Sequence, residues 1–305
     1  MSNQRIAYYN GDYLPESEVR IPFRDRGFLL GDGLFDMTRT FGGHIFRIEA
    51  HVRRLYESLR AMRIEVDLTQ AEMIAISNEV LARNAGFLDA TSDYWVAQRI
   101  SRGVNAVGDE GWPEQGPTVI VECIPLPMKA RAPYFRDGID LVVSPVRRTP
   151  PDSLTPRAKT ANYLNLITAN QAVPMATPTT MALLLDMHGN LAEGLGANVF
   201  IVKDDRLLTP KAQFVLPGIS RACVMELARD AGFEVLEMDL DLHDAYNADE
   251  IFVTSTSLCI VPARTFCGAL IGIGEVPGPV TRRLTQAYVD LVEFDFVKQF
   301  LDHLE

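Results

Sequence analysis

The first fifty residues alternate short apolar runs with turn residues, a pattern that is typical of β-strands. Asn10-Gly11 separates two such runs in RIAYYNGDYLP, and this dipeptide is a strong signal for a tight hairpin turn. Gly31-Asp32-Gly33 and Gly42-Gly43 break the following segment, RDRGFLLGDGLFDMTRTFGGHIF. The pattern therefore predicts short strands over residues 5–48.

The period of the apolar positions changes after residue 48. Apolar side chains then recur every three or four residues, at Ile48, Val52, Leu55, Leu59 and Met62. This spacing predicts an amphipathic helix. A second helix is expected in LTQAEMIAISNEVLARNAGF, because Thr69 and Glu72 have the spacing of a capping box and Gly86 stands at its end.

Two apolar strands are predicted in DYWVAQRISRG and PTVIVECIPLP, and a polar, proline-rich segment over residues 125–138 follows them. We interpret this segment as an interdomain linker. It separates an N-terminal domain, residues 1–124, from a C-terminal domain, residues 139–305. Strands and helices mix in both parts without the strict alternation of a doubly wound sheet, which favours an α+β fold.

Composition and charge narrow the class of protein. Hydrophobic residues make up 47% of the 305 residues, enough for a substantial core. The formal net charge is −11 and basic residues are dispersed, which argues against a nucleic-acid partner. No apolar run reaches the length of about 20 residues that a spanning helix needs, and the start of the chain lacks a signal peptide. We expect a cytoplasmic protein.

The cysteines and histidines indicate neither disulfides nor a metal site. The four cysteines form no CxxC pair and mostly stand in apolar runs, so buried reduced thiols are expected. The histidines show no metal-ligand spacing.

Lysine is rare in this chain and one lysine stands out. Only five of the 29 basic residues are lysines: Lys129, Lys159, Lys203, Lys211 and Lys298. Lys159 alone leads directly into an apolar segment, PRAKTANYLNLITANQ, in which a helix is predicted. It is either a capping or snorkelling side chain or a reactive amine, and Tyr163 would lie one helical turn away.

Three further features have both a structural and a functional interpretation. Glu193 precedes Gly194 in NLAEGLGANVFIV and is either a turn acid or a ligand that pairs with a pyridinium nitrogen. LPGISR begins a helix and TSTS, residues 254–257, ends a strand; each is either a cap or an oxyanion site. Arg54 lies beside the apolar stripe of its helix and could reach inward to bind a phosphate.

Together these motifs resemble the class IV (fold type IV) aminotransferases, which depend on pyridoxal phosphate (PLP). The resemblance extends from RDRGFLLGDGLF to GPVTRRLTQAY. It implies two α+β domains with PLP between them and an active site at a homodimer interface. It also implies that Lys159 binds PLP covalently and shuttles the proton. The other cofactor residues that it implies are Arg54, Tyr163, Glu193, Ile219, Ser220, Ser255 and Thr256.

The substrate is less well defined by the motifs. Phe35-Asp36-Met37-Thr38-Arg39 agrees with the FEGxR pattern of branched-chain aminotransferases at its first and last positions only. We expect Arg99 or Arg39 to bind the substrate carboxylate and Phe35 and Ser257 to contact the substrate. Branched-chain or other aliphatic amino acids are the expected donors, with a 2-oxo acid as acceptor. The alternatives are an (R)-selective amine transaminase, a D-amino acid transaminase and an aminodeoxychorismate lyase.

Overall fold

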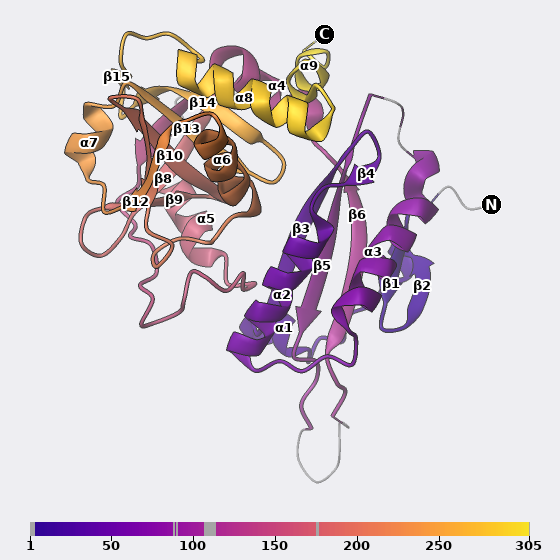
Figure 1. The fold of residues 1–305 in the computed structure, drawn as a ribbon. Coiled ribbons are helices and arrows are strands. Elements are labelled where there is room, and N and C mark those ends of the chain that lie inside the picture. Colours follow the sequence, from indigo (N-terminus) through magenta and orange to yellow (C-terminus); the bar gives the residue numbers. More distant parts are fainter. Residues whose placement is uncertain (1–3, 88, 90, 107–113, 175–176, 305) are drawn as a thin grey trace. The chain divides into compact units, whose positions relative to one another are not determined.

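The computed structural model describes residues 4–87, 89, 91–106, 114–174 and 177–304. The chain forms two compact units. The first unit comprises Met1–Leu126 together with the short segment Ala158–Asn162, and the second comprises Pro127–Arg157 and Tyr163–Glu305. Helices and strands are mixed in each, as Figure 1 shows, so the predicted α+β class is confirmed.

Within its described residues the first unit contains a six-stranded antiparallel sheet with the strand order β2-β1-β6-β5-β3-β4. Helices α2 and α3 cover one face of it (Figure 1) and enclose the apolar core of the unit. The strands are β1 Ile6–Tyr9, β2 Asp12–Pro15, β3 Gly33–Phe41, β4 His44–Ile45, β5 Tyr94–Ser101 and β6 Thr118–Pro125. The α-helices are α1 Arg26–Leu30, α2 Ile48–Met62 and α3 Gln70–Asn84.

Two local signals of the sequence are confirmed, whereas helix α3 ends at Asn84, before the expected Gly86. Asn10 and Gly11 adopt positive φ angles of 47° and 107° in the β1–β2 turn, as a tight hairpin requires. Thr69 and Glu72 form the capping box of α3. The strands expected over residues 5–48 are interrupted at α1, because the Asp25 carboxylate accepts hydrogen bonds from the first N–H groups of this short helix.

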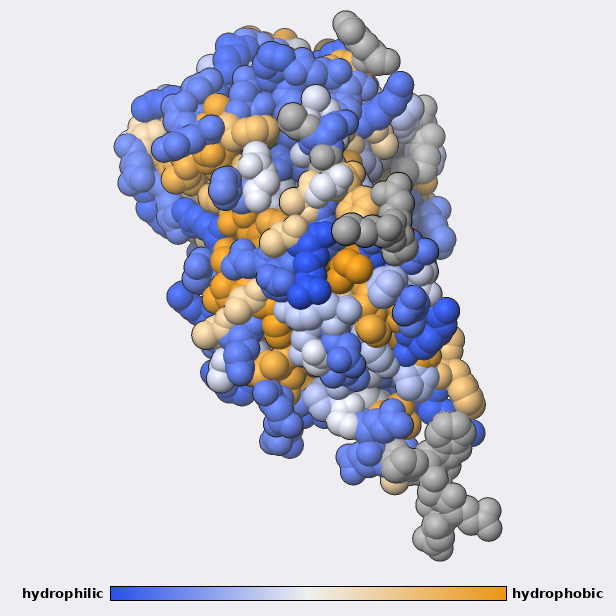
Figure 2. Space-filling model, turned by 90° about the vertical axis from the view of Figure 1, so that its right-hand side faces the viewer, coloured by the Kyte–Doolittle hydropathy of each residue, from blue (hydrophilic) through white to orange (hydrophobic). Residues whose placement is uncertain are grey.

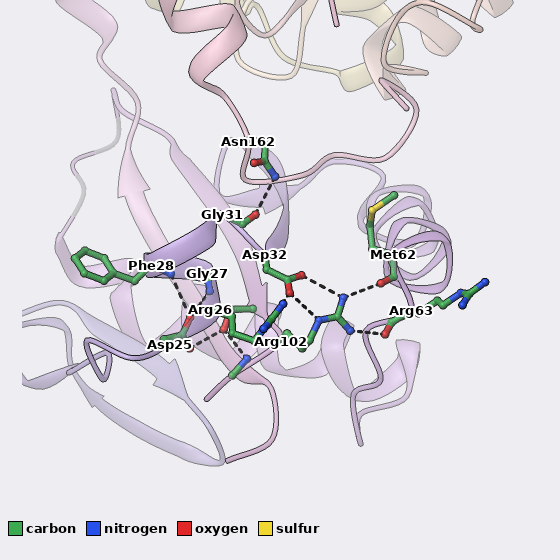
Figure 3. Close-up of polar contacts among 12 residues, drawn as sticks. Asp25, Arg26, Gly27, Phe28, Gly31, Asp32, Met62, Arg63, Arg102 and Asn162 are labelled. Carbon is green, nitrogen blue, oxygen red and sulfur yellow. Dashed lines mark hydrogen bonds and ion pairs between the residues drawn. The ribbon is translucent and has the colours of Figure 1, made fainter. Parts of the chain in front are cut away.

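The loop after α1 is held by a charged cluster, shown in Figure 3. Asp32 accepts hydrogen bonds from Arg26 and Arg102, both at 2.8 Å, and Arg102 also donates to two carbonyl groups at the C-terminal end of α2. Asn162 Nδ2 donates to the Gly31 carbonyl at 2.9 Å. The segment that carries Lys159 is thereby attached to the first unit.

Within its described residues the second unit contains a nine-stranded mixed sheet. Because β9 pairs with both β8 and β10, the strands β10, β13, β14, β7, β8 and β9 form a closed ring. The strands are β7 Ile139–Val143, β8 Thr180–Leu185, β9 Leu191–Gly194, β10 Ala197–Lys203, β11 Arg206–Pro210, β12 Glu234–Met238, β13 Glu250–Ser255, β14 Cys259–Phe266 and β15 Ala269–Leu270. The α-helices are α4 Met128–Asp137, α5 Leu164–Gln171, α6 Ile219–Asp230, α7 Leu242–Tyr246, α8 Pro279–Val292 and α9 Phe296–Leu301.

The predicted linker needs correction. The unit boundary falls at residue 126, within the expected linker, but most of the rest of this segment is helix α4. Phe135 faces inward from α4, and its ring stacks on that of Phe300 with centroids 4.4 Å apart. Near the C-terminal end of the described residues, helices α8 and α9 are separate, because Glu293 between them adopts a positive φ angle of 50°.

The described residues contain no helix that is long and apolar enough to cross a membrane. All four cysteines are free thiols, and Cys123, Cys223 and Cys259 are buried as expected. Cys267 is exposed, in contrast to this expectation.

Candidate functional site

Lys159 is positioned by backbone pairing to strand β3. An isolated antiparallel bridge joins Thr160 to Leu34, and the Phe35 N–H donates to the Lys159 carbonyl at 3.0 Å. Lys159 therefore lies opposite Phe35, with both side chains on the same face. The Lys159 Nζ is 4.6 Å from the centroid of the Phe35 ring. The amine is thus held over an aromatic face, where a cation is attracted to the ring.

The helix expected around Lys159 begins later in the chain. Helix α5 starts at Leu164, after Tyr163 as its N-cap. Tyr163 is therefore not one helical turn from Lys159, because the backbone around Lys159 is paired with β3 instead. Tyr163 belongs to the second unit, where it packs against the cluster that contains Leu166.

A buried charged cluster joins β3 to α2. Arg54 Nε and Nη2 donate to the two carboxylate oxygens of Asp36 at 2.8 and 2.7 Å, and His51 Nδ1 lies 2.7 Å from Asp36 Oδ1. Asp36 also accepts from the Met37 N–H at 2.7 Å. Arg54 therefore points inward as predicted, with two of its five N–H donors bound to Asp36.

The charges of this cluster shift the pKa values of its members. Burial opposes ionisation of Asp36, but Arg54 and His51 outweigh it and hold the pKa of this carboxyl well below its usual range. Burial lowers the pKa of His51 and outweighs the attraction of Asp36, while Arg54 and Lys159 lower it further. We therefore assign a neutral imidazole to His51, with the Nδ1 proton donated to Asp36.

The lowered pKa of His51 predicts a pH dependence of stability. The unfolded chain takes up a proton at His51 below a pH of about 6.5, whereas the folded chain does so only at lower pH. The free energy of unfolding should therefore fall as the pH decreases below about 6.5, by up to about 1.4 kcal/mol per pH unit.

Urea unfolding at pH 7.5, 6.5 and 5.5 measures this effect. The His51→Gln variant should show a smaller fall in stability over this range than the wild type. His44→Gln is the control, because His44 is exposed, and it should retain the wild-type pH dependence. Equal pH dependence in His51→Gln and wild type would contradict the neutral assignment.

Ser58 connects this cluster to the lysine. The Lys159 N–H donates to Ser58 Oγ at 3.3 Å, and Ser58 Oγ donates to the Arg54 carbonyl at 2.9 Å. His51, Arg54 and Ser58 form one buried stripe along α2. The sequence analysis selected Arg54 but not His51, Ser58 or Asp36. The helical spacing of His51, Arg54 and Ser58 was a usable signal for the two residues on α2.

The sheet face opposite α2 and α3 carries the other predicted substrate residues of the first unit. Arg99 lies directly opposite Phe35, and its guanidinium carbon is 5.5 Å from the Phe35 ring centroid. Arg39 is 1% exposed; its guanidinium lies over the Phe41 ring at 4.0 Å and 3.7 Å from Asp93. The Lys159 amine and the Arg99 guanidinium therefore both lie near the Phe35 ring, whereas Arg39 is buried among other partners.

In the second unit Glu193 is buried and its carboxylate is bound at both oxygens. Arg148 Nε donates to Oε1 at 2.8 Å, and the Leu216 N–H donates to Oε2 at 3.0 Å. Asn165, in the first turn of α5, accepts from the Thr149 N–H at 3.1 Å and so fixes the loop that carries Arg148. The carboxylate is thus held in one orientation by groups that the sequence did not indicate.

A polar row crosses the sheet beside Glu193. Glu193, Asn198 and Thr254 are direct neighbours on β9, β10 and β13, so their side chains lie on one face. Asn198 Nδ2 donates to the Leu216 carbonyl at 3.0 Å. A Cβ atom at Gly218 would lie 2.2 Å from Asn198 Oδ1, so a larger residue here would displace the Asn198 amide. Asn198 therefore lies between the two predicted oxyanion sites.

The first oxyanion site is the N-terminus of α6. The helix begins at Ile219, no side chain caps it, and its first turn contains no acidic residue. Ser220 in this turn is buried. Uncapped N–H groups at a helix start form a site for a phosphate-sized anion.

The second oxyanion site is the turn between β13 and β14. Thr254 Oγ1 is buried without a hydrogen-bond partner among the described residues. Ser255 Oγ accepts from the Leu258 N–H at 3.2 Å, and Arg131 of α4 donates to Ser257 Oγ. Thr256 lies at the tip of this turn. An orphaned hydroxyl and a nearby guanidinium fit an anionic group at this turn.

Comparison with known proteins agrees with this geometry. Residues 33–266 match the family model of amino-transferase class IV. The chain is 37% identical over 286 residues to a putative branched-chain-amino-acid aminotransferase of Methanocaldococcus jannaschii, covering 93% of this chain and 95% of the relative. It is 31% identical to the branched-chain-amino-acid aminotransferase of Escherichia coli, covering 95% and 94% of the two chains.

Solved structures show the same likeness. A crystal structure of the Escherichia coli branched-chain amino acid aminotransferase superposes with a TM-score of 0.84 at 28% identity and covers 96% of both chains. A T.th. branched-chain amino acid aminotransferase, complexed with N-(5'-phosphopyridoxyl)-L-glutamate, has a TM-score of 0.83 at 28% identity and covers 95% of this chain and 94% of its own. The chain belongs to the class IV aminotransferase family.

Proposed function

We propose that this protein transfers an amino group between a branched-chain or other aliphatic amino acid and a 2-oxo acid, with PLP as its cofactor. The observation that carries this proposal is the Lys159 amine, fixed by β3 over the Phe35 ring in a chain of the class IV family. The names of the similar proteins support the branched-chain substrate class.

The donor groups present fit PLP at both of its ends. Glu193 would hold the pyridine nitrogen in its protonated form. The α6 N-terminus with Ile219 and Ser220, the turn with Ser255 and Thr256, and Arg54 would bind the phosphate; Tyr163 would bind the ring hydroxyl. When bound, PLP supplies an electron sink for the negative charge that develops at the substrate α-carbon.

The protein groups supply orientation and proton transfer. Lys159 would carry the cofactor and then move a proton at the substrate α-carbon, which requires a positioned amine. Ser58 fixes the lysine backbone from α2, and the Phe35 ring shields the amine from water on one side. Arg148 and the Leu216 N–H keep Glu193 in place, so this carboxylate needs no reorganisation during the reaction.

The substrate would be contacted by Phe35, Arg99 and Ser257. Of the two arginines expected to bind a substrate carboxylate, we favour Arg99 for the side-chain carboxylate of a dicarboxylic donor or acceptor, because its side chain is 43% exposed while Arg39 is fully buried. In the second unit Arg131 donates a hydrogen bond to Ser257 Oγ and so places a positive charge beside this serine.

We also propose a homodimer, the assembly that the class IV resemblance implies. Large apolar side chains lie exposed in and before α1, where Phe28 is 73% and Leu30 62% exposed. Ile21, Phe23 and Leu29 in the same segment are also exposed. Figure 2 shows that hydrophobic side chains also reach the surface among hydrophilic ones on the face that it presents. Apolar patches of this kind are typical of protein contact surfaces.

A half-reaction screen tests the proposed function. The protein is loaded with PLP and mixed separately with L-leucine, L-glutamate, D-alanine and (R)-1-phenylethylamine, and conversion of PLP to its pyridoxamine form is followed by absorbance. We expect conversion with L-leucine and L-glutamate. Preferential conversion with (R)-1-phenylethylamine or D-alanine would instead favour one of the alternative transaminases, and no conversion with any donor would contradict amino transfer.

A further inference from the structure

On the face of the first-unit sheet that carries Phe35, three residues lie side by side in one row: Lys159, Phe35 and Arg99. Lys159 lies opposite Phe35, and Phe35 lies opposite Arg99 on β5. The lysine Nζ is 4.6 Å from the centroid of the Phe35 ring, and the Arg99 guanidinium carbon is 5.5 Å from the same centroid. The two cations are therefore separated by no more than the sum of these distances.

Arg99 is already engaged with a carboxylate of the protein. Its Nε lies 2.5 Å from Oε1 of Glu122 on β6, the next strand of the sheet. The side chain of Arg99 is 43% exposed and that of Glu122 is 18% exposed. A pair with this much solvent contact is accessible, so an incoming carboxylate competes with Glu122 for Arg99.

The surroundings of the pair are mostly apolar. Met37 and Ala97 form the next row of the same face, and Glu122 lies directly opposite Ala97. Ile120 lies directly opposite Arg99. A neutral aliphatic side chain on this face would meet hydrocarbon and a cation already neutralised by Glu122. An anionic side chain would meet the same cation but also the negative charge of Glu122.

We propose that Glu122 sets the preference of the site between aliphatic and anionic amino acids by occupying Arg99. This inference rests on the proposed transaminase function and deepens it. Glu122 acts through Arg99 and is therefore a positioning residue. With an aliphatic substrate the pair stays closed, whereas with a dicarboxylic substrate the side-chain carboxylate replaces Glu122 at the guanidinium. Repulsion between Glu122 and the side-chain carboxylate of the substrate disfavours binding of the dicarboxylic substrate.

The test compares L-glutamate with L-leucine in the PLP-loaded protein. Rate constants of the two half-reactions are measured at several donor concentrations for the wild type, Glu122→Gln, Arg99→Gln and the double variant. Glutamine matches glutamate in size and removes only its charge. We expect Glu122→Gln to raise the ratio of kcat/KM for glutamate to that for leucine by roughly tenfold, mainly through a lower KM for glutamate.

The Arg99→Gln background provides the decisive comparison. Arg99→Gln should lower the same ratio, and adding Glu122→Gln to it should give no further rise. Glu79→Gln is a matched control, because Glu79 also pairs with an arginine, Arg83, but on helix α3, which covers the other face of the sheet; it should leave the ratio unchanged. Should Glu122→Gln fail to fold, the effect of Arg99→Gln on the ratio still tests the proposal.

Three results would overturn this inference. They are an unchanged ratio in Glu122→Gln, an unchanged ratio in Arg99→Gln, and a rise on adding Glu122→Gln that persists without Arg99. Each of them leaves the proposed function intact as long as the wild type converts PLP with L-leucine. Failure of the wild type with every donor would instead overturn the proposed function.

Discussion

Replacement of Lys159 by methionine is expected to abolish amino transfer while leaving the fold intact. Positioned general acid–base groups contribute about 10²–10⁴-fold to rates, and Lys159 would also anchor the cofactor, so the loss should be at least of this order. Methionine retains an unbranched apolar stem that can pack against the Phe35 ring. The pairing to β3 uses the backbone of residue 159 and is unaffected by the substitution.

The half-reaction with L-leucine measures this loss, and urea unfolding measures whether the fold is kept. Lys298→Met is the control, because Lys298 lies on α9 with its side chain 68% exposed and paired with Asp302. It should retain wild-type rates. A Lys159→Met protein that still converts PLP at a comparable rate would rule out Lys159 as the reactive amine.

The second large effect is expected at Asp36, in the buried charged cluster. Replacing Asp36 by asparagine removes the negative charge that faces Arg54, which is 6% exposed. An uncompensated buried charge typically costs about 3–5 kcal/mol. We expect the free energy of unfolding at pH 7.5 to fall by an amount of this order.

The sign of the pH effect follows from the depressed pKa of Asp36. Its contribution to stability is fully present above the unfolded pKa of about 3.9 and is lost as the pH falls through the lower folded pKa. Measurement at pH 7.5 therefore captures the whole contribution of this carboxylate.

Two controls separate this effect from ordinary surface electrostatics. Glu79→Gln breaks an exposed pair with Arg83 on α3 and should cost less than about 1 kcal/mol. A double variant, Asp36→Leu with Arg54→Met, removes both charges. Its loss of stability should be smaller than the sum of the losses in the single variants Asp36→Leu and Arg54→Met. Additive losses would show that the two side chains do not act as a pair.

Several elements of the fold were predictable because their signals are local. The Asn10-Gly11 turn depends on the backbone freedom of two residues, and both adopt the positive φ angles that this turn requires. The capping box of Thr69 and Glu72 depends on residues three positions apart. The 3.6-residue period of α2 predicted both the helix and its buried face.

The predictions that failed involve long-range pairing or a mixed pattern. The backbone around Lys159 is paired with a strand more than 120 residues earlier in the chain. The helix that the apolar pattern predicts in this segment therefore begins only at Leu164. Residues 125–138 resemble a linker in sequence because their prolines and charges obscure the buried stripe of Met128, Ala132 and Phe135 on α4.

The sequence by itself determined the α+β class, the class IV resemblance and the choice of Lys159 and Glu193 as the proposed central site residues. Only the tertiary structure decided which partners these residues have. Strand register placed Lys159 over Phe35, burial placed Asp36 against Arg54, and the chain brought Arg148 to Glu193 and Glu122 to Arg99. The physical reason is that a pairing between distant side chains depends on register and burial, which no local pattern specifies.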